Sequence, residues 1–275
     1  MSKNEDINEL LYLCFLLINS ETGKPILKNE EWKNDAQALG VKLFRHITSA
    51  QTLTKASTFK YKNLVRIQYI DHSSVAIAIR AAIETYLAFN YIFANENINL
   101  SIFRHSIWCL GGLLDRSKLF ANTPESIDKL AKEAELILEL KEKVQSSQYF
   151  IDSNRDTKKD ILSGKWKPKG GWNNLGGHAN IHQTYFDDIY NHLSGHSHAS
   201  YISAMQTRDA QDIQSQRMLA DSTEQIACLM LAHFTFAYIK LFPNAKKITD
   251  LNKPLYEIAR KWHIQKEDVD FLYKR

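Results

Sequence analysis

Histidines are concentrated in one part of this 275-residue chain: five of the ten lie between Gly176 and Ser203. Within that segment Tyr190, Ser194 and His198 recur every four residues, which places them along one flank of a helix. A phenol, a hydroxyl and an imidazole on one flank can bind a polar substrate and transfer protons. We therefore expect a site in which His198 is a general acid or base and Tyr190 and Ser194 bind substrate.

A second pair of polar residues lies in an almost wholly apolar helical segment, residues 73–95. Arg80 and Glu84 are four residues apart and so share a helix face. Two buried charges cost several kcal/mol each unless partners complete their hydrogen bonds. One interpretation is a structural ion pair. The other is a catalytic cluster with His198, in which Arg80 stabilises developing negative charge and Glu84 orients one of the other two groups.

Other histidines have spacings that metal ligands also use. Asp188, His192 and His196 form a stripe, but it starts nearly opposite the apolar side of its helix, so we expect Asp188 and His192 to be solvated. His178 and His182 are four apart in HANIH, which lacks the glutamate of the zinc-protease motif HExxH. The chain also has no GxxxxGK[ST], GxSxG, CxxC or dinucleotide-binding glycine motif. We expect no metal and no cofactor.

A lysine- and tryptophan-rich stretch, GKWKPKGGWNNLGG, interrupts the helical pattern. In one interpretation it is a nucleic-acid contact loop, in which Lys165 meets phosphate while Trp166 and Trp172 stack on bases. In the other it is a crossover loop that the two tryptophans pin to the helices below. Both interpretations make Lys165, Trp166 and Trp172 candidates for substrate binding.

The elements that must position these residues are helices. Apolar residues recur at helical spacing, no alternating strands separated by hairpin turns are visible, and only 5 prolines and 10 glycines occur. We predict an all-α multi-helix bundle, with one central buried helix at about 73–95 and a long irregular loop at about 152–177. The expected organisation is a single helical domain over 1–275: N-terminal helices in 1–56, a core in 57–242 and short helices in 243–275. Further helices are predicted over about 6–20, 29–55, 100–120, 124–146, 178–203 and 209–241.

The composition limits the classes of binding partner and the cellular compartment that we expect for this protein. The chain has 35 basic and 31 acidic residues, a mixture too even for a dedicated nucleic-acid or membrane binder, so any basic surface must be local. The apolar run from Leu10 to Ile18 is too short for a membrane span. Three widely separated cysteines without metal-type spacing indicate reduced thiols in a cytoplasmic protein.

Two short motifs carry a resemblance to a known family. They are Asp71-His72-Ser73-Ser74-Val75 leading to Arg80 and Glu84-Thr85-Tyr86, and the later Tyr190-x-x-x-Ser194-x-x-x-His198. Together they resemble a family of bacterial all-helical proteins known only as a domain of unknown function, over roughly residues 59–242. The resemblance implies a helical cytosolic fold with Arg80, Glu84, Ser194 and His198 as signature positions.

A more distant similarity is to the HEPN ribonucleases of toxin and antiviral systems, which cut RNA with an arginine and a histidine a few residues apart on one helix. Arg66 and His72 in RIQYIDH have a comparable separation. Ile67 stands where that family usually has a polar residue, and Asp71 and Ser73 look like a helix start.

Three functions follow as hypotheses. The first is a metal-independent ribonuclease-like effector of the kind found in toxin or phage-defence systems, which uses the Arg80, Glu84 and His198 cluster. The second is a non-catalytic ligand-binding or regulatory partner protein. The third is a structural domain whose polar cluster fixes the helix register. The expected partners are RNA or a small anionic ligand, and a second copy or another protein, with no membrane.

Overall fold

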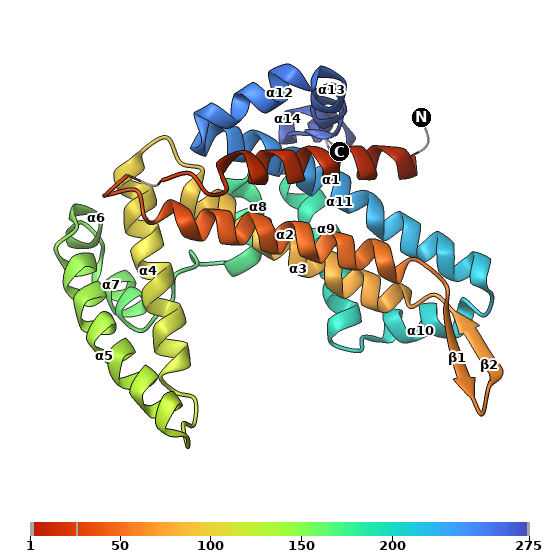
Figure 1. Cartoon of the computed structure of the whole chain (residues 1–275), viewed down its shortest axis with the longest axis horizontal. Helices are drawn as coiled ribbons and strands as arrows, with labels where there is room; N and C mark the ends of the chain where they lie inside the picture. The colour runs from red at the N-terminus through yellow and green to blue at the C-terminus, as the bar shows by residue number, and fades with distance from the viewer. Residues whose placement is uncertain (1–2, 26, 274–275) are drawn as a thin grey trace. The chain divides into compact units, whose positions relative to one another are not determined.

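A computed structural model describes residues 3–25 and 27–273 and confirms the all-α class (Figure 1). By their internal contacts the residues divide into two compact units, whereas the sequence predicts one domain. The larger unit contains residues 1–90 and 176–275, and the smaller contains residues 91–175. Because the smaller unit is an insertion in the chain of the larger, the candidate polar residues of the two units are described separately.

The larger unit is built around long helices that pack through apolar faces. Its N-terminal helix α1 contacts α11 and α13 extensively, and the side chains of Leu10, Leu13 and Leu17 are fully buried. Asp6 at the start of α1 is also buried and accepts hydrogen bonds from Lys261 and Trp262, both of α13. The elements are α1 (Lys3–Glu21), α2 (Lys33–Leu53), β1 (Ser57–Tyr61), β2 (Leu64–Tyr69), α3 (His72–Phe93), α9 (Gln183–Ser197), α10 (Tyr201–Asp209), α11 (Ile213–Leu241), η1 (Pro243–Ala245), α12 (Lys246–Leu251), α13 (Lys253–Trp262) and α14 (Lys266–Tyr273).

Helix α3 is the central buried helix that the sequence predicts. Val75, Ile79, Ala82 and Leu87 are completely buried along it. By length and composition α3 could cross a membrane, but 61% of the relevant stretch is buried inside the protein, as in the core helix of a globular domain. Its position between other helices explains why an apolar sequence surrounds Arg80 on nearly every side.

The β-hairpin formed by β1 and β2 corrects the prediction that this part of the chain contains no strands. Lys62 and Asn63 make the two-residue turn, and both have positive φ, at 49° and 62°. A turn of this kind matches the twist of the two strands and usually contains glycine. The hairpin was missed because Lys62-Asn63 has no glycine and because the strands lack a buried face.

The histidine-rich segment also differs from the predicted continuous helix over 178–203. Helix α9 ends at Ser197, Ala199 adopts a left-handed conformation with φ 49°, and α10 begins after Ser200. The Ser200 side chain accepts a hydrogen bond from the Ser203 backbone and so caps α10. This break, which serine capping and the left-handed residue produce together, removes His198 from the regular helix.

The smaller unit contains helices where the sequence predicts an irregular loop at 152–177. The irregular parts are residues 152–154, between α6 and α7, and residues 163–170, between α7 and α8. Gly164 has φ 92°, and a Cβ on Gly111 would lie 2.5 Å from the Gly164 carbonyl oxygen, so two glycines let this turn approach α4 closely. The elements are the end of α3, α4 (Ile98–Arg116), α5 (Pro124–Gln145), α6 (Gln148–Ile151), α7 (Arg155–Leu162) and the start of α8 (Gly171–His178).

Candidate functional site

The candidate site lies along the contact between α3 and α9 in the larger unit, which we call the α3–α9 seam. Ser73 contacts His196, and Arg80 contacts Tyr190. Because residue numbers rise along α3 while their partners' numbers fall along α9, the two helices are antiparallel. The seam therefore carries two polar groups in a fixed order, separated by the two helical turns between Ser73 and Arg80, or about 10 Å.

The first group, which we call the closed cluster, consists of Arg80, Glu84 and Tyr190. The Tyr190 hydroxyl donates a 2.7 Å hydrogen bond to Glu84 Oε1 and accepts one of 3.2 Å from Arg80 Nη2. Arg80 Nη2 also lies 3.1 Å from Glu84 Oε1, so each of the three groups contacts the other two. The arginine and glutamate side chains are only 21% and 26% exposed. Tyr190 is thus the partner that the two charges on α3 require.

The surroundings of the closed cluster favour a protonated Tyr190 and a charged Arg80. Burial, together with the hydrogen bond to Glu84, raises the pKa of Tyr190 to about 12, so the phenol stays protonated and keeps donating. Burial works against the charge of Arg80, but its interactions with Tyr190 and Glu84 outweigh that effect and raise the pKa of the guanidinium. Arg80 Nε is buried without a hydrogen-bond partner among the described residues.

The second group, which we call the histidine cluster, consists of His72, His192 and His196. The His196 ring meets the other two edge-on, at centroid distances of 5.9 Å to His72 and 5.4 Å to His192. His196 Nδ1 is 3.1 Å from the Ser73 hydroxyl, which fixes the orientation of the ring. From His72 through His196 to His192, the three side chains change from buried through half-buried to exposed.

Two imidazoles of the histidine cluster are biased toward their neutral form. Burial lowers the pKa of His196, and the neighbouring His192 and His72 lower it further. Burial also lowers the pKa of His72, which Asp71 offsets only in part. In the described part of the chain, His72 Nε2 is buried without a hydrogen-bond partner. A half-buried, neutral and oriented imidazole such as His196 is suited to accept a proton near neutral pH.

The same histidines are the residues of the seam that could hold a transition metal, because His192 and His196 are four apart on one helix. Their ligand atoms and those of His72 do not all lie within 4.8 Å of one another in the described residues. A shared ion would therefore require the rings to rotate. Asp188 and His192 are exposed, as the sequence predicts.

The other sequence-predicted residues of α9 lie apart from the closed cluster. His198 is exposed, follows the last residue of α9, and has no side-chain hydrogen bond or ion pair in the part of the chain that the structure describes. Eight residues separate it from Tyr190, which corresponds to about 12 Å along a helix. Ser194 is half-buried. The structure thus joins Arg80 and Glu84 to Tyr190, while His196 takes the inward-facing position that the sequence assigns to His198.

The predicted lysine and tryptophan contacts belong to the smaller unit. Trp166 packs on the apolar cluster of that unit, and its ring meets Trp172 edge-on at 5.7 Å. Lys165 forms an exposed ion pair with Asp160 at 2.8 Å. Lys167 Nζ lies 4.3 Å from the centre of the Trp172 ring. These contacts favour the interpretation in which the tryptophans pin a turn to the helices, and binding of nucleic acid there stays a prediction.

Sequence reasoning missed His196 and Ser73 as a pair. The helical wheel placed His196 on the outer stripe because it continued the angle of Asp188 for two turns. The sequence nevertheless contains a signal for Ser73, because Asp71-His72-Ser73 indicates a helix start. Asp71 caps α3 through Ser74, whose backbone nitrogen and hydroxyl both donate to its carboxylate. This cap holds His72 and Ser73 in the first turn, beside α9.

Arg66 and His72, the pair behind the comparison with HEPN ribonucleases, do not share a helix. Arg66 lies on strand β2 and is exposed, whereas His72 is the first residue of α3 and is buried. The two side chains therefore occupy different environments.

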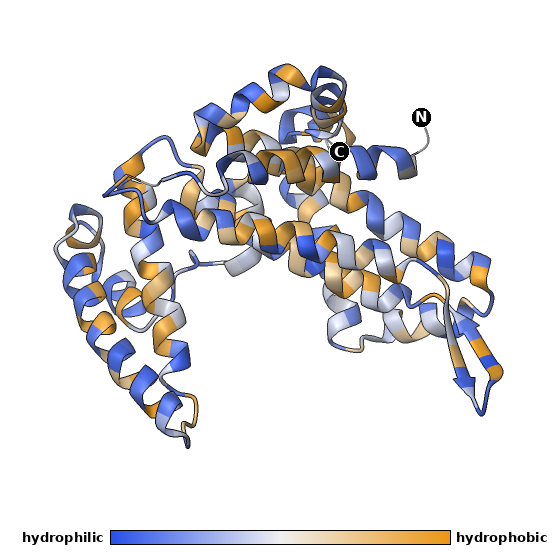
Figure 2. Ribbon diagram, in the orientation of Figure 1, coloured by the Kyte–Doolittle hydropathy of each residue, from blue (hydrophilic) through white to orange (hydrophobic). Residues whose placement is uncertain are grey.

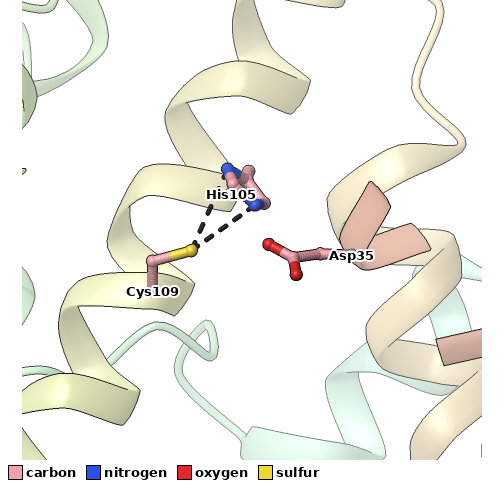
Figure 3. A group of neighbouring side chains, drawn as sticks. All are labelled: Asp35, His105 and Cys109. Atoms are coloured by element: carbon pink, nitrogen blue, oxygen red, sulfur yellow. Dashed lines mark hydrogen bonds between the residues drawn. The ribbon is translucent and has the colours of Figure 1, made fainter. Parts of the chain in front are cut away.

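A different pair of reactive residue types lies in the smaller unit. On α4, Cys109 Sγ is 3.4 Å from His105 Nε2, with the two residues one helical turn apart (Figure 3). Cys109 is half-buried, whereas Cys14 and Cys228 in the larger unit are buried and burial raises the pKa of both thiols. The expectation of reduced thiols is consistent with this distribution, because the described cysteines form no disulfide.

Comparisons with known proteins give no match: no protein-family model, no curated protein and no solved structure is similar to this chain.

Proposed function

We propose that the chain is a metal-independent ribonuclease whose chemistry takes place at the histidine cluster. The observation that carries this proposal is the placement of His196: its ring is half-buried, its Nδ1 faces Ser73, and the exposed His192 lies beside it. Two adjacent imidazoles with different exposure can act as a general base and a general acid at neutral pH. The role that the sequence assigns to His198 thus passes to His196.

In the proposed reaction His196 takes the proton of a ribose 2′-hydroxyl, and the 2′-oxygen attacks the adjacent phosphorus. The bond from phosphorus to the 5′-oxygen breaks, and His192 donates its proton to that leaving oxygen. The products are a 2′,3′-cyclic phosphate and a free 5′-hydroxyl, so no oxidant, water molecule or metal ion enters the balance. RNA is the substrate class because DNA has no 2′-hydroxyl.

Arg80 serves as a binding residue in this proposal. Its Nη2 is occupied by Tyr190 and Glu84, while Nη1 has no hydrogen bond within the described residues. A guanidinium fixed on one side and open on the other is suited to a phosphate oxygen. Arg80 lies about two helical turns from Ser73, and this separation supports contact with another phosphate of the same strand.

The test is an incubation of the purified chain with end-labelled single-stranded RNA in the presence of EDTA. We expect cleavage that yields 2′,3′-cyclic phosphate ends, no cleavage of a DNA strand of the same sequence, and loss of activity in His196→Ala. The His196→Ala protein is purified in the same way, so its lack of cleavage also excludes contaminating nucleases as the source of activity. A requirement for divalent metal, cleavage of DNA, or equal activity in His196→Ala would overturn the proposal.

A second candidate function is a non-catalytic RNA-binding or regulatory protein. The specific observation in its favour is the closed cluster, in which Tyr190 bridges the two charges through hydrogen bonds without any ligand. In that case the wild-type chain leaves RNA intact under all conditions, and its stability depends on Tyr190 more than its function does.

A further inference from the structure

The β-hairpin of β1 and β2 has one apolar face and one polar face. Paired residues of an antiparallel ladder project to the same side of the sheet. The pairs Phe59 with Ile67, Tyr61 with Leu64 and Ser57 with Tyr69 therefore share a face, while Thr58 with Gln68 and Lys60 with Val65 share the other. A register shift beside Phe59 leaves Arg66 as the extra residue of β2.

The apolar face is exposed to solvent rather than packed on a helix. Every residue from Lys55 to Tyr69 is exposed, and the large apolar side chains have exposed fractions of 37–59%. The hairpin extends beyond the ends of α2 and α3, and hydrophobic and hydrophilic residues alternate along it (Figures 1 and 2). A two-stranded hairpin with no buried face is marginally stable by itself, and so much exposed apolar surface is typical of a binding site.

The charge of the hairpin is entirely positive. The segment 55–69 contains Lys55, Lys60, Lys62 and Arg66 and no acidic residue. The whole chain has a formal net charge of +4, so these four cations account for all of it. The rest of the chain is electrically balanced. The hairpin is therefore a local basic surface, the only kind that the even overall composition allows.

We propose that the β1–β2 hairpin is a docking surface for single-stranded RNA, on which bases stack against Phe59, Tyr61 and Tyr69 while Lys55, Lys62 and Arg66 contact phosphates. Aromatic side chains on a strand surface, interleaved with lysines, are the arrangement that binds unpaired bases without sequence preference. Phe59 and Tyr61 lie two residues apart on one strand, about 6.7 Å, which leaves room for one base on each ring.

Other occupants fit this surface less well. A second copy of the chain would bring an identical set of four cations against the first, and lysines on edge strands oppose such pairing. An anionic membrane would attract the cations and accommodate aromatic rings at its interface, but the six partly exposed apolar residues of the hairpin offer it little surface to insert. Both the aromatic and the cationic residues are matched by a nucleic-acid strand.

The hairpin also leads directly into the proposed reaction site. Tyr69 ends β2, and His72 of the histidine cluster begins α3 only three residues later. The Ile70 backbone between them donates to Gln216 of α11, which fixes the base of the hairpin. The identity of the strand as substrate rests on the proposed ribonuclease function, whereas binding to the hairpin does not require cleavage.

The test is fluorescence anisotropy of a labelled 2′-O-methyl oligouridine of about twelve nucleotides, which cannot be cleaved through the 2′-hydroxyl. We expect Phe59→Ala and Tyr61→Ala each to raise the Kd about tenfold. The matched control is Tyr12→Ala, which removes an equally exposed aromatic ring from α1 and should leave the Kd unchanged.

Salt dependence tests the cations. If these three cations contact phosphates, log Kobs should fall against log salt with a slope of about −2, and Lys62→Gln, at the turn beside the Tyr61 ring, should reduce that slope by about 0.7. Lys129→Gln on α5, an exposed lysine of the smaller unit, is the charge-matched control and should leave the slope unchanged.

Three outcomes would overturn the hairpin proposal. They are unchanged Kd in both aromatic variants, equal competition by phosphatidylserine vesicles, and a dimer in sedimentation that Phe59→Ala dissociates. Thermal melting monitored by circular dichroism verifies that each variant folds. Binding without any cleavage would contradict only the ribonuclease, while cleavage with unchanged binding in the hairpin variants would contradict only the hairpin.

Discussion

The two polar groups of the α3–α9 seam differ in how completely their hydrogen bonds are satisfied. In the closed cluster, Tyr190 donates to Glu84 and accepts from Arg80, so the two charges that α3 carries are paired within the protein, although Arg80 Nε is buried without a partner in the described residues. In the histidine cluster, His72 Nε2 lacks a partner in the described residues and His192 is exposed. The same two helices thus provide a stabilising network at one position and uncommitted proton-transfer groups at another.

This difference assigns the two clusters different roles: the closed cluster contributes mainly to the stability of the fold, and the histidine cluster mainly to proton transfer. The Glu84 carboxylate and the Tyr190 hydroxyl are committed to each other and to Arg80, which stabilises the fold and leaves only the guanidinium of this cluster able to meet a ligand. Imidazoles that are oriented but incompletely paired can exchange protons with a ligand. Substitutions of Glu84 and Tyr190 should therefore affect mainly unfolding, and substitutions in the histidine cluster should affect mainly cleavage.

The largest expected effect is the loss of cleavage when both imidazoles are removed. General acid and general base groups contribute about 10² to 10⁴ each, so His192→Ala/His196→Ala should reduce the rate by at least about 10⁴-fold. The measurement is the single-turnover rate on labelled RNA, with the melting temperature as the control for folding. A residual rate near that of the wild type would show that the chemistry lies elsewhere.

Next in size is the cost of removing a charge from the closed cluster. Glu84→Ala leaves Arg80 and the Tyr190 hydroxyl without their shared acceptor, and loss of hydrogen bonds to a charged group costs about 2 kcal/mol. Urea denaturation should show this decrease in the free energy of unfolding. Ser194→Ala, which removes a half-buried hydroxyl on the same helix, should change it by less than about 0.5 kcal/mol. Equal effects of the two substitutions would refute the role of the network.

Tyr190→Phe should have a smaller effect on unfolding. The ring still packs, and the direct contact of Arg80 with Glu84 at 3.1 Å persists. The loss is then that of the bridging hydroxyl alone, about 1 kcal/mol. Urea denaturation measures it, and a double-mutant cycle with Glu84→Ala should show strong coupling between the two positions. Additive effects would mean that the hydroxyl does not bridge the pair.

The smallest expected effect is a dependence of the free energy of unfolding on pH. Because the pKa values of His72 and His196 are lowered in the folded state, the unfolded chain binds protons more readily below about pH 6.5. The stability that the two neutral imidazoles contribute is present above that pH. It is lost as the pH falls through their pKa values in the folded state. His72→Gln should therefore lose less stability between pH 7 and 5 than the wild type, measured by urea denaturation at each pH. A steeper loss in the variant would reverse the sign of the argument.

The sequence predicts the helical class and the buried helix α3 because apolar periodicity is a strong signal over twenty residues. It also predicts that Arg80 and Glu84 share one face of α3, because they are four residues apart, and that Tyr190 lies at the apolar side of its own helix, so the three side chains can meet. The inward histidine could not be predicted, because α9 ends before His198 at a left-handed Ala199 that no glycine or proline announces. The α9 face that meets α3 also depends on packing, which helical periodicity alone does not determine.

Tertiary structure explains the other differences as well. The hairpin has no buried face, so the alternation of its apolar residues could not be attributed to a core. Trp166 and the glycines at 111 and 164 order a turn through contacts between distant residues of the smaller unit. Such contacts leave no local periodic signal in the sequence.

The most direct test of the central claim compares two histidines that lie only two residues apart on the chain. His196→Ala should lower the single-turnover rate of RNA cleavage by at least about 100-fold, whereas His198→Ala, at an exposed position beyond the end of α9, should leave the rate unchanged. The opposite result, with activity lost in His198→Ala and retained in His196→Ala, would place the chemistry outside the α3–α9 seam and contradict the account.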